Sequence, residues 1–335
     1  MDQPGPQNAI TDVAGLRVGQ AEDRDLTTGV TVVLPDRPAV AAVDVRGGAP
    51  GTRETAALAS ERTVQTVDAV VLSGGSAFGL DAAGGVMDAL RRQGRGIALA
   101  GLHVPIVPAA ILFDLAVGGP AQWDTPPWFA LGHAAVGAAD TAIRLGNAGA
   151  GLGATAGAVK GGTGTASAAT AVGVVGALAI ANPIGSVLMP GSRVFWTWWL
   201  ERRGELGGQT PPKAAPQSDP EPQRLGPNTT LAVVATDARL TRAEAERIAV
   251  MAQDGIARAI RPVHAPFDGD TVFVLSTAER PGPKDSRALM QLGSAAADCV
   301  ARAVMRGVFE ADPLPGWPAY RDLGEDGRPE VKTEV

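Results

Sequence analysis

A threonine at the start of an apolar run is the first residue whose position suggests chemistry. A proline-rich, charged segment over residues 211–227 ends at Asn228, and Thr229 and Thr230 then precede the apolar run 231–235. An N-terminal-nucleophile hydrolase needs such an arrangement, because its precursor is cut directly before the residue that becomes both nucleophile and base. The hydroxyl of Thr229 is therefore a candidate nucleophile. In the alternative interpretation, the two threonines only begin a strand after a disordered linker.

Two aspartates further along the chain form a second candidate group. Asp268 and Asp270 stand two positions apart within residues 267–273. In a strand, this spacing directs both carboxylates to the same face of the sheet. The alternative is a turn without a chemical role, since Asp-Gly is a common hairpin dipeptide.

The composition limits the classes of partner and cofactor. Charged residues make up 19% of the 335-residue chain, the formal net charge is −6, and Lys and Arg form no basic stripe, so we expect no nucleic-acid partner. Cys299 is the single cysteine, and His103, His133 and His264 fit no metal-ligand spacing, so we expect no internal disulfide, metal or other cofactor. The sequence shows neither a signal peptide nor a bilayer-spanning stretch, which predicts a cytoplasmic protein with no membrane partner.

Strand and helix patterns occur in alternating blocks. Apolar runs predict strands over 29–34, 40–45, 69–73, 171–181, 231–235 and 271–276. Helical spacing predicts helices over 80–92, 133–144, 245–260 and 286–305, the third of them opened by a capping box from Thr241 to Glu244. This alternation predicts two sheets packed face to face with helices outside each. Residues 201–228 are expected to be a flexible linker.

Two further features allow more than one interpretation. The turn over residues 73–79 has the pattern Gly-Gly-x-x-x-Gly rather than the dinucleotide-binding pattern, so a nucleotide-binding oxidoreductase is only a distant alternative. Residues 195–200 contain Trp196, Trp198 and Trp199, and a strand would place the first two on one face. We expect them in the core or at a subunit interface, with the wall of an apolar substrate channel as the alternative.

Taken together, the motifs resemble the DmpA-like family of self-cleaving aminopeptidases and nylon-oligomer hydrolases. The similarity extends from about Asn8 to about Val308 and is carried by residues 8–19, 72–80, 104–108, 160–167, 228–237 and 267–273. The resemblance implies an α+β fold with a four-layer αββα sandwich, built by one catalytic domain over residues 1–335. It also implies cleavage between Asn228 and Thr229 into chains 1–228 and 229–335 that stay associated, and assembly into a homo-oligomer, commonly a tetramer.

The resemblance also assigns roles to single residues. Thr229 would be nucleophile and base at once, because an α-amino group with a pKa of about 7.7–8.0 can accept the hydroxyl proton near neutral pH. In the family, the pair matching Asp268 and Asp270 orients the terminal amine and the hydroxyl. Lys160 matches a lysine whose charge helps to keep that amine neutral. Asn182 matches the asparagine whose side-chain amide stabilises the oxyanion. Taken alone, Lys160 could be a solvated loop lysine and Asn182 a turn residue.

Differences from the family pattern bear on the substrate. This chain has two aspartates at 268 and 270, as the nylon-oligomer hydrolases do, where β-aminopeptidases carry serine and glutamate. Phe113 stands where the family often has a tyrosine, which leaves the role of this position open. Residues 104–112 are apolar, whereas aminopeptidases hold a carboxylate near there to bind the substrate's ammonium. We therefore expect an endo-acting amide hydrolase whose partner is a small linear amide or peptide, such as a 6-aminohexanoate oligomer.

Several alternatives remain. The first is an aminopeptidase of broad β- or D-residue specificity. A non-catalytic scaffold would keep the bond between Asn228 and Thr229 intact. The acyltransferase of arginine biosynthesis shares the fold and the threonine nucleophile. The Asp-Gly-Asp motif at residues 268–270 argues against this acyltransferase.

Overall fold

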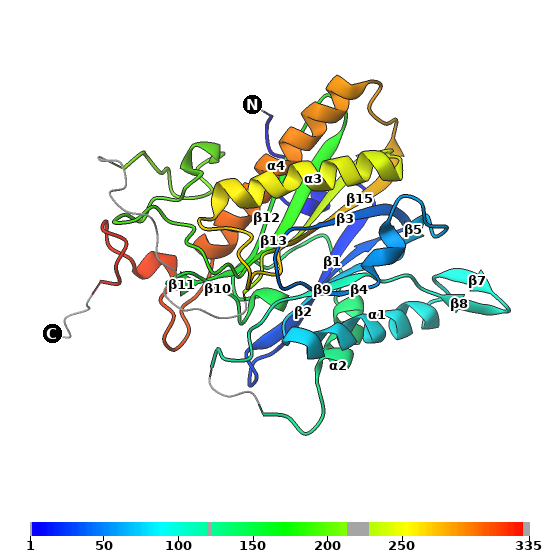
Figure 1. The fold of residues 1–335 in the computed structure, drawn as a ribbon, viewed down its shortest axis with the longest axis horizontal. Helices are drawn as coiled ribbons and strands as arrows, with labels where there is room; N and C mark the ends of the chain where they lie inside the picture. The colour runs from blue at the N-terminus through cyan, green and yellow to red at the C-terminus, as the bar shows by residue number, and fades with distance from the viewer. Residues whose placement is uncertain (1, 119–121, 213–227, 331–335) are drawn as a thin grey trace.

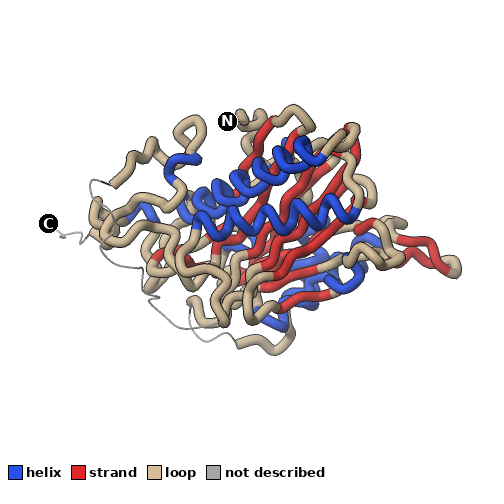
Figure 2. The backbone as a smooth tube through the Cα atoms, turned by 45° about the horizontal axis from the view of Figure 1, so that its top comes forward, coloured by secondary structure: helices blue, strands red, loops and turns tan. Residues whose placement is uncertain are grey.

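Two β-sheets lie face to face in the computed structural model, and two helices cover the outer face of each (Figures 1 and 2). The structure describes residues 2–118, 122–212 and 228–330. The larger sheet has the order β12 (Gly162–Ala169), β13 (Val174–Ala181), β14 (Leu231–Ala238), β15 (Thr271–Arg280), β3 (Ala39–Val45) and β5 (Thr66–Val67). The smaller sheet has the order β1 (Leu16–Asp23), β2 (Thr28–Pro35), β6 (Val70–Ser73), β9 (Ala109–Ile111) and β4 (Gly51–Arg53).

Strand direction is mostly antiparallel. The exceptions are β14 beside β15 and β6 beside β9, which are parallel. The described residues also form two short hairpins: β7 (Ile97–Leu99) with β8 (Leu102–Val104), and β10 (Thr155–Ala156) with β11 (Val159–Lys160). The first hairpin extends away from the sandwich, whereas the second lies beside the ends of the larger sheet (Figure 1).

The four helices form the two outer layers. Helices α1 (Asp81–Arg92) and α2 (Trp128–Gly137) pack on the smaller sheet, and α3 (Arg242–Ala259) and α4 (Ser286–Phe309) pack on the larger one. Helix α3 begins as predicted, since Thr241 Oγ1 accepts the N–H of Glu244 and the Glu244 carboxylate accepts the N–H of Thr241 at 2.8 Å. The αββα sandwich within the α+β class is thus confirmed. No helix of the described ranges is long and apolar enough to cross a membrane.

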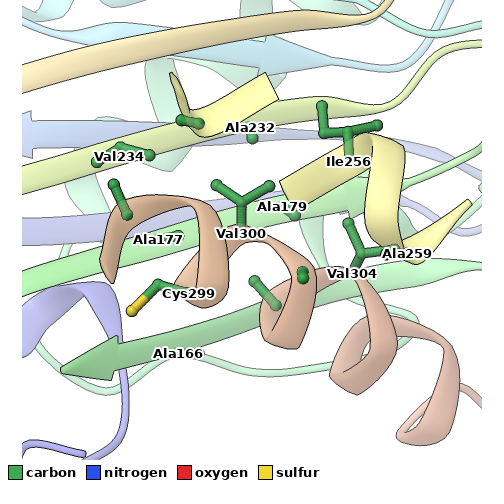
Figure 3. Close-up of a cluster of buried hydrophobic side chains, with 14 of the residues drawn as sticks. Ala166, Ala177, Ala179, Ala232, Val234, Ile256, Ala259, Cys299, Val300 and Val304 are labelled. Atoms are coloured by element: carbon green, nitrogen blue, oxygen red, sulfur yellow. The ribbon is translucent and has the colours of Figure 1, made fainter. Parts of the chain in front are cut away.

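Alternation along β14 shows how the layers are joined. Leu231, Val233 and Ala235 point into the core between the two sheets, and Ala232 and Val234 point into the core beneath α3 and α4. Period-2 alternation with both faces buried explains why the whole strand is apolar. Figure 3 shows the second core, where the alanines of the larger sheet lie under valines of α4 and Ile256 of α3. These small side chains allow the helices to approach the sheet closely.

Two predicted elements were wrong in position or type. The helix expected over 133–144 is α2, which ends at Gly137, because Asp140 instead exchanges two backbone hydrogen bonds with Val18 of β1. The tryptophan motif is not a strand: it ends in a single 3₁₀ turn over Trp198–Leu200, so alternation does not place Trp196 and Trp198. Instead, the indole of Trp196 donates to the carbonyl of Ser186 at 3.1 Å.

Part of the segment expected to be a flexible linker lies within the described residues and makes buried contacts. The carboxylate of Glu201 accepts backbone N–H groups of three residues, among them Leu206, which is buried. Glu205 forms a buried ion pair with Arg302 of α4 at 2.6 Å. Residues 201–209 are therefore packed against the domain, and residues 213–227 of the predicted linker lie outside the described residues.

Candidate active site

The parallel pair β14 and β15 brings the two sequence motifs together. In their register Leu231 lies opposite Thr271, so Thr230 and Asp270, one position before each strand, also lie side by side. Two positions before Thr230 and Asp270 in the sequence, Asn228 and Asp268 form an isolated parallel β-bridge. Since parallel strands begin at the same edge of a sheet, segments widely separated in sequence meet at one point.

Thr229 is buried at this edge, with 4% of its surface exposed. Its backbone N–H donates to the carbonyl oxygen of Asn182 at 2.8 Å, and its hydroxyl donates to the carbonyl oxygen of Asn228. That same carbonyl oxygen accepts the N–H of Gly269 at 3.0 Å. A Cβ atom on Gly269 would lie 2.6 Å from the hydroxyl oxygen of Thr229, so only glycine fits between the two aspartates. The carbonyl oxygen of Asn228 thus has two hydrogen-bond donors.

Both oxygens of the Asp270 carboxylate have partners. Oδ1 accepts the N–H of Thr230 at 2.7 Å. Oδ2 accepts the N–H of His264 at 3.2 Å and lies 2.8 Å from Nδ1 of the same histidine. His264 was not expected here, because no sequence pattern indicated a role for it. The one feature of the sequence that could have indicated a role for His264 is its position six residues before Asp270, on the loop that leads into β15.

Asp268 is buried beside Asp270, and each is 1% exposed. Its carboxylate accepts the N–H of Ala265 at 2.8 Å and that of Ile184 at 3.4 Å. Burial raises the pKa of Asp268 to about 6, and the negative charge of Asp270 adds to the rise. The two aspartates therefore differ: Asp270 holds the backbone next to Thr229, whereas Asp268 can exchange a proton near neutral pH.

Asn182 follows β13 directly and is fully buried. Its side-chain oxygen accepts the N–H of Thr155 at 2.8 Å, and its side-chain nitrogen lies 3.4 Å from the carbonyl oxygen of Phe113. Position 113 thus contributes a backbone carbonyl to this site. Because the backbone carbonyl of Asn182 also holds Thr229, this residue contacts the candidate nucleophile directly.

Lys160 is buried on β11, where it pairs with Thr155 of β10. Its ammonium group donates to the carbonyl oxygens of Gly151 at 2.9 Å and Gly161 at 3.0 Å, rather than to Thr229. Burial lowers the pKa of Lys160 to about 7, and the charge of Asp114 opposes that change. The interpretation of Lys160 as a solvated loop residue is therefore wrong. The structure connects it to Asn182 through Thr155.

Asp114 is a buried carboxylate for which no sequence pattern indicated a role. It accepts hydrogen bonds from the hydroxyl of Thr28 and the N–H of Gly75, both at 2.7 Å. Burial raises the pKa of Asp114 to about 6, although the positive charge of Lys160 counteracts this. The carboxylate of Asp114 thus lies two residues after the apolar stretch 104–112. It already accepts hydrogen bonds from Thr28 and Gly75. The glycine turn of residues 73–79 packs around this side chain, since a Cβ atom on Gly74 would lie 2.0 Å from its Oδ2.

In the part of the chain that the structure describes, no group of three or more His, Cys, Asp or Glu side chains is arranged to hold a metal ion. The site instead consists of a hydroxyl, two carboxylates, an amide and a buried amine. These are the groups of acyl transfer by a side-chain nucleophile.

A sequence model of peptidase family S58 matches residues 8–320. The chain belongs to peptidase family S58. A family relative from Mycobacterium tuberculosis, described as an uncharacterized aminopeptidase, is 46% identical over 94% of this chain and 98% of its own length. The 6-aminohexanoate-oligomer endohydrolase of Paenarthrobacter ureafaciens is 30% identical over 88% of this chain and 82% of its own length.

Solved structures agree on the fold of this S58 chain. The L-aminopeptidase D-Ala-esterase/amidase of Ochrobactrum anthropi, described as a variant of the Ntn-hydrolase fold, superposes with a TM-score of 0.68. It is 23% identical and covers 95% of this chain and 91% of its own. The resemblance to the DmpA-like family is therefore confirmed, and the protein is a peptidase or amidohydrolase of family S58.

Proposed function

We propose that the protein is a self-processing amide hydrolase in which Thr229, once freed as an N-terminus, is the nucleophile. The observation that carries this proposal is the geometry of the bond between Asn228 and Thr229. The hydroxyl of Thr229 contacts the carbonyl oxygen of Asn228, and that oxygen also accepts the N–H of Gly269. A nucleophile and a donor for the developing negative charge are therefore present at the bond to be cut.

Self-cleavage begins with attack of the Thr229 oxygen on the carbonyl carbon of Asn228. The bond from that carbon to the Thr229 nitrogen breaks as the nitrogen takes up the proton that the hydroxyl loses, which leaves an ester between Asn228 and the hydroxyl oxygen. Water then hydrolyses the ester, giving the carboxylate of Asn228 and a free threonine N-terminus. Asp270 supports this step, because it holds the N–H of Thr230 and so fixes the backbone after the nucleophile.

Substrate hydrolysis uses the same atoms with an external amide. The α-amine of Thr229 takes the hydroxyl proton, and the oxygen attacks the substrate carbonyl to form a tetrahedral intermediate. The amine of the substrate leaves from this intermediate as it takes up that proton, and water then hydrolyses the resulting acyl-enzyme. Lys160 lies buried and can carry a positive charge, which favours the neutral form of a nearby amine. The amide of Asn182 is the proposed donor to the substrate oxyanion. Asp268 and Asp270 are proposed to orient the amine and the hydroxyl.

The substrates that we propose are short linear amides, such as 6-aminohexanoate oligomers, cut internally. The two aspartates and the likeness to the endohydrolase of Paenarthrobacter ureafaciens support this choice. The second candidate is an aminopeptidase, which the name of the Mycobacterium tuberculosis relative favours. Asp114 does not decide between them, because its carboxylate is held by Thr28 and Gly75.

Intact mass spectrometry tests the nucleophile. The wild-type protein should give two fragments that meet at Thr229, whereas Thr229→Ala should remain one chain of 34.0 kDa without activity. Thr229→Ser should still be cleaved. Thr230→Val is the matched control, because the hydroxyl of Thr230 is buried and has no hydrogen-bond partner among the described residues. Two fragments from Thr229→Ala in a protease-free preparation would refute the proposal.

An N-acetylated 6-aminohexanoate oligomer separates the two substrate modes. An endo-acting hydrolase cleaves it at internal bonds, because it does not need the terminal ammonium. An aminopeptidase cleaves only the free oligomer. Product masses from both substrates under the same conditions decide between the two modes.

A further inference from the structure

His264 makes two contacts with the carboxylate that faces Thr230. Its backbone N–H donates to Oδ2 of Asp270 at 3.2 Å, and its ring nitrogen Nδ1 lies 2.8 Å from the same oxygen. Because a carboxylate oxygen accepts, Nδ1 is the protonated nitrogen in this contact. The side chain is 22% exposed and that of Asp270 is 2% exposed, so the contact lies at the edge of the buried site.

The backbone of His264 is held in an unfavourable conformation. Its φ of 52° lies in the left-handed region, which residues other than glycine adopt rarely, with asparagine, aspartate and histidine the most frequent among them. Strain of this kind persists where the surroundings determine the conformation. Here both contacts to Asp270 depend on it, because the N–H and the ring of one residue reach the same oxygen.

We propose that His264 is a positioning residue that orients the Asp270 carboxylate and thereby the backbone that carries the Thr229 nucleophile. The chain of contacts runs from Nδ1 of His264 to Oδ2 of Asp270, and from Oδ1 of Asp270 to the N–H of Thr230. With Oδ2 held by two donors, the carboxylate has one orientation, and Oδ1 faces Thr230. This inference rests on the proposed function of Thr229.

The imidazole of His264, when it is protonated, also acts on the second aspartate. A positive charge on the imidazole lowers the pKa of Asp268, against the larger effects of burial and of the Asp270 charge. The two carboxylates and the imidazole thus form one electrostatic group beside Thr229. His264 faces both of them from the loop before β15.

Two substitutions separate the side-chain contact from the backbone strain. His264→Asn keeps a side-chain donor near the place of Nδ1 and tolerates a positive φ, whereas His264→Gly tolerates the same φ but has no side-chain donor. We expect His264→Asn to cleave itself and to turn over substrate within about threefold of wild type. We expect His264→Gly to lose about tenfold or more in both rates, with kcat reduced and KM unchanged.

A second measurement does not depend on cleavage. In the uncleaved Thr229→Ala background, hydrogen exchange at the N–H of Thr230 reports its bond to Asp270 directly. Exchange should accelerate about tenfold or more with His264→Gly and stay near the parent rate with His264→Asn. Wild-type rates and exchange in His264→Gly, or equal losses in both variants, would overturn the inference. A wild-type protein that does not cleave itself would instead refute the proposed function, and the exchange experiment would still test His264.

Discussion

The carbonyl oxygen of Asn182 accepts the backbone N–H of Thr229 at 2.8 Å, while the side chain of Asn182 lies between Thr155 and Phe113. One residue therefore holds the nitrogen of the candidate nucleophile and supplies the proposed oxyanion donor. After cleavage that nitrogen would be an amine. Its bond to the same carbonyl would use one proton and leave the lone pair free to accept the hydroxyl proton.

Substitution of Asn182 tests its side chain separately from its backbone. Asn182→Ala keeps the carbonyl that holds Thr229 but removes the amide, so we expect kcat to fall by about 10²–10³ with the Thr229 nitrogen still in place. Steady-state kinetics on a 6-aminohexanoate oligomer measure the loss. Thr155→Ala is the control, because it removes only a hydroxyl contact of 3.5 Å to Asn182. An unchanged kcat in Asn182→Ala would mean that donors other than the Asn182 amide stabilise the oxyanion.

The aspartates should each be needed for turnover or processing. Asp268→Ala and Asp270→Ala are expected to lower one of these rates by about tenfold or more, which corresponds to about 1.4 kcal/mol of transition-state stabilisation. Glu279→Gln is a suitable control, since Glu279 is exposed at the far end of the same strand, β15. Wild-type rates in both alanine variants would mean that the Asp-Gly-Asp sequence is only a turn.

Lys160 should titrate near neutral pH. Its pKa is lowered to about 7 by burial, whereas an unfolded chain holds the proton up to about 10.5, so the cost of burying the charge is greatest below about pH 7 and decreases as the pH rises above it. The chain has four lysines, Lys160, Lys213, Lys284 and Lys332, so the NMR spectrum of ¹³C-labelled lysine contains few signals to assign. One signal should titrate near pH 7 and disappear in Lys160→Met. A Lys160 signal that stays protonated through pH 9 would contradict this.

The same lysine should affect the pH dependence of activity. Loss of its charge in Lys160→Met favours the protonated form of the Thr229 amine, so the acidic limb of the kcat profile should move to higher pH. Lys284→Met, on the exposed segment before α4, should leave the profile unchanged. An identical pH profile in both variants would mean that Lys160 does not affect the protonation of the Thr229 amine.

Asp268 should make folding stability depend on pH. Its pKa is raised from 3.8 to about 6, so the folded chain binds this proton more tightly than the unfolded chain. The resulting stabilisation is complete below about pH 3.8 and is lost as the pH rises through about 6, with a slope of at most about 1.4 kcal/mol per pH unit. Urea unfolding of Thr229→Ala, with and without Asp268→Asn, measures this difference. The slope should be flatter in the double variant, and equal slopes would contradict the expectation.

Assembly into a homo-oligomer, commonly a tetramer, stays a prediction. Trp199 is 48% exposed, and Trp196 and Trp198 beside it are only partly buried, which favours coverage by another subunit. Trp199→Glu should weaken the assembly, and light scattering measures its mass. Access to a site between subunits would admit short linear amides and exclude folded proteins. A fully active species of 34.0 kDa would contradict the assembly, and rapid digestion of a folded protein would contradict the access.

Much of the fold could be predicted because its signals are local. The apolar run of β14, the capping box at Thr241 and the helical stripe of α4 each depend on residues within a few turns or positions of one another. The tryptophan motif was placed wrongly for the opposite reason. Its short period fits a strand, but its tertiary contacts, such as the bond from Trp196 to Ser186, hold it in an irregular segment.

The sequence by itself indicated the strands β2, β3, β6, β13, β14 and β15, the helices α1, α3 and α4, the family resemblance and the set of candidate residues around Thr229. Tertiary structure alone decided how they meet: the register of β14 on β15 places Thr230 beside Asp270, and a loop residue, His264, completes the carboxylate's contacts. It also buried Lys160 and Asp114 within reach of each other's charge. Strand register and burial arise from packing between distant segments, and such packing leaves no periodic pattern in the chain.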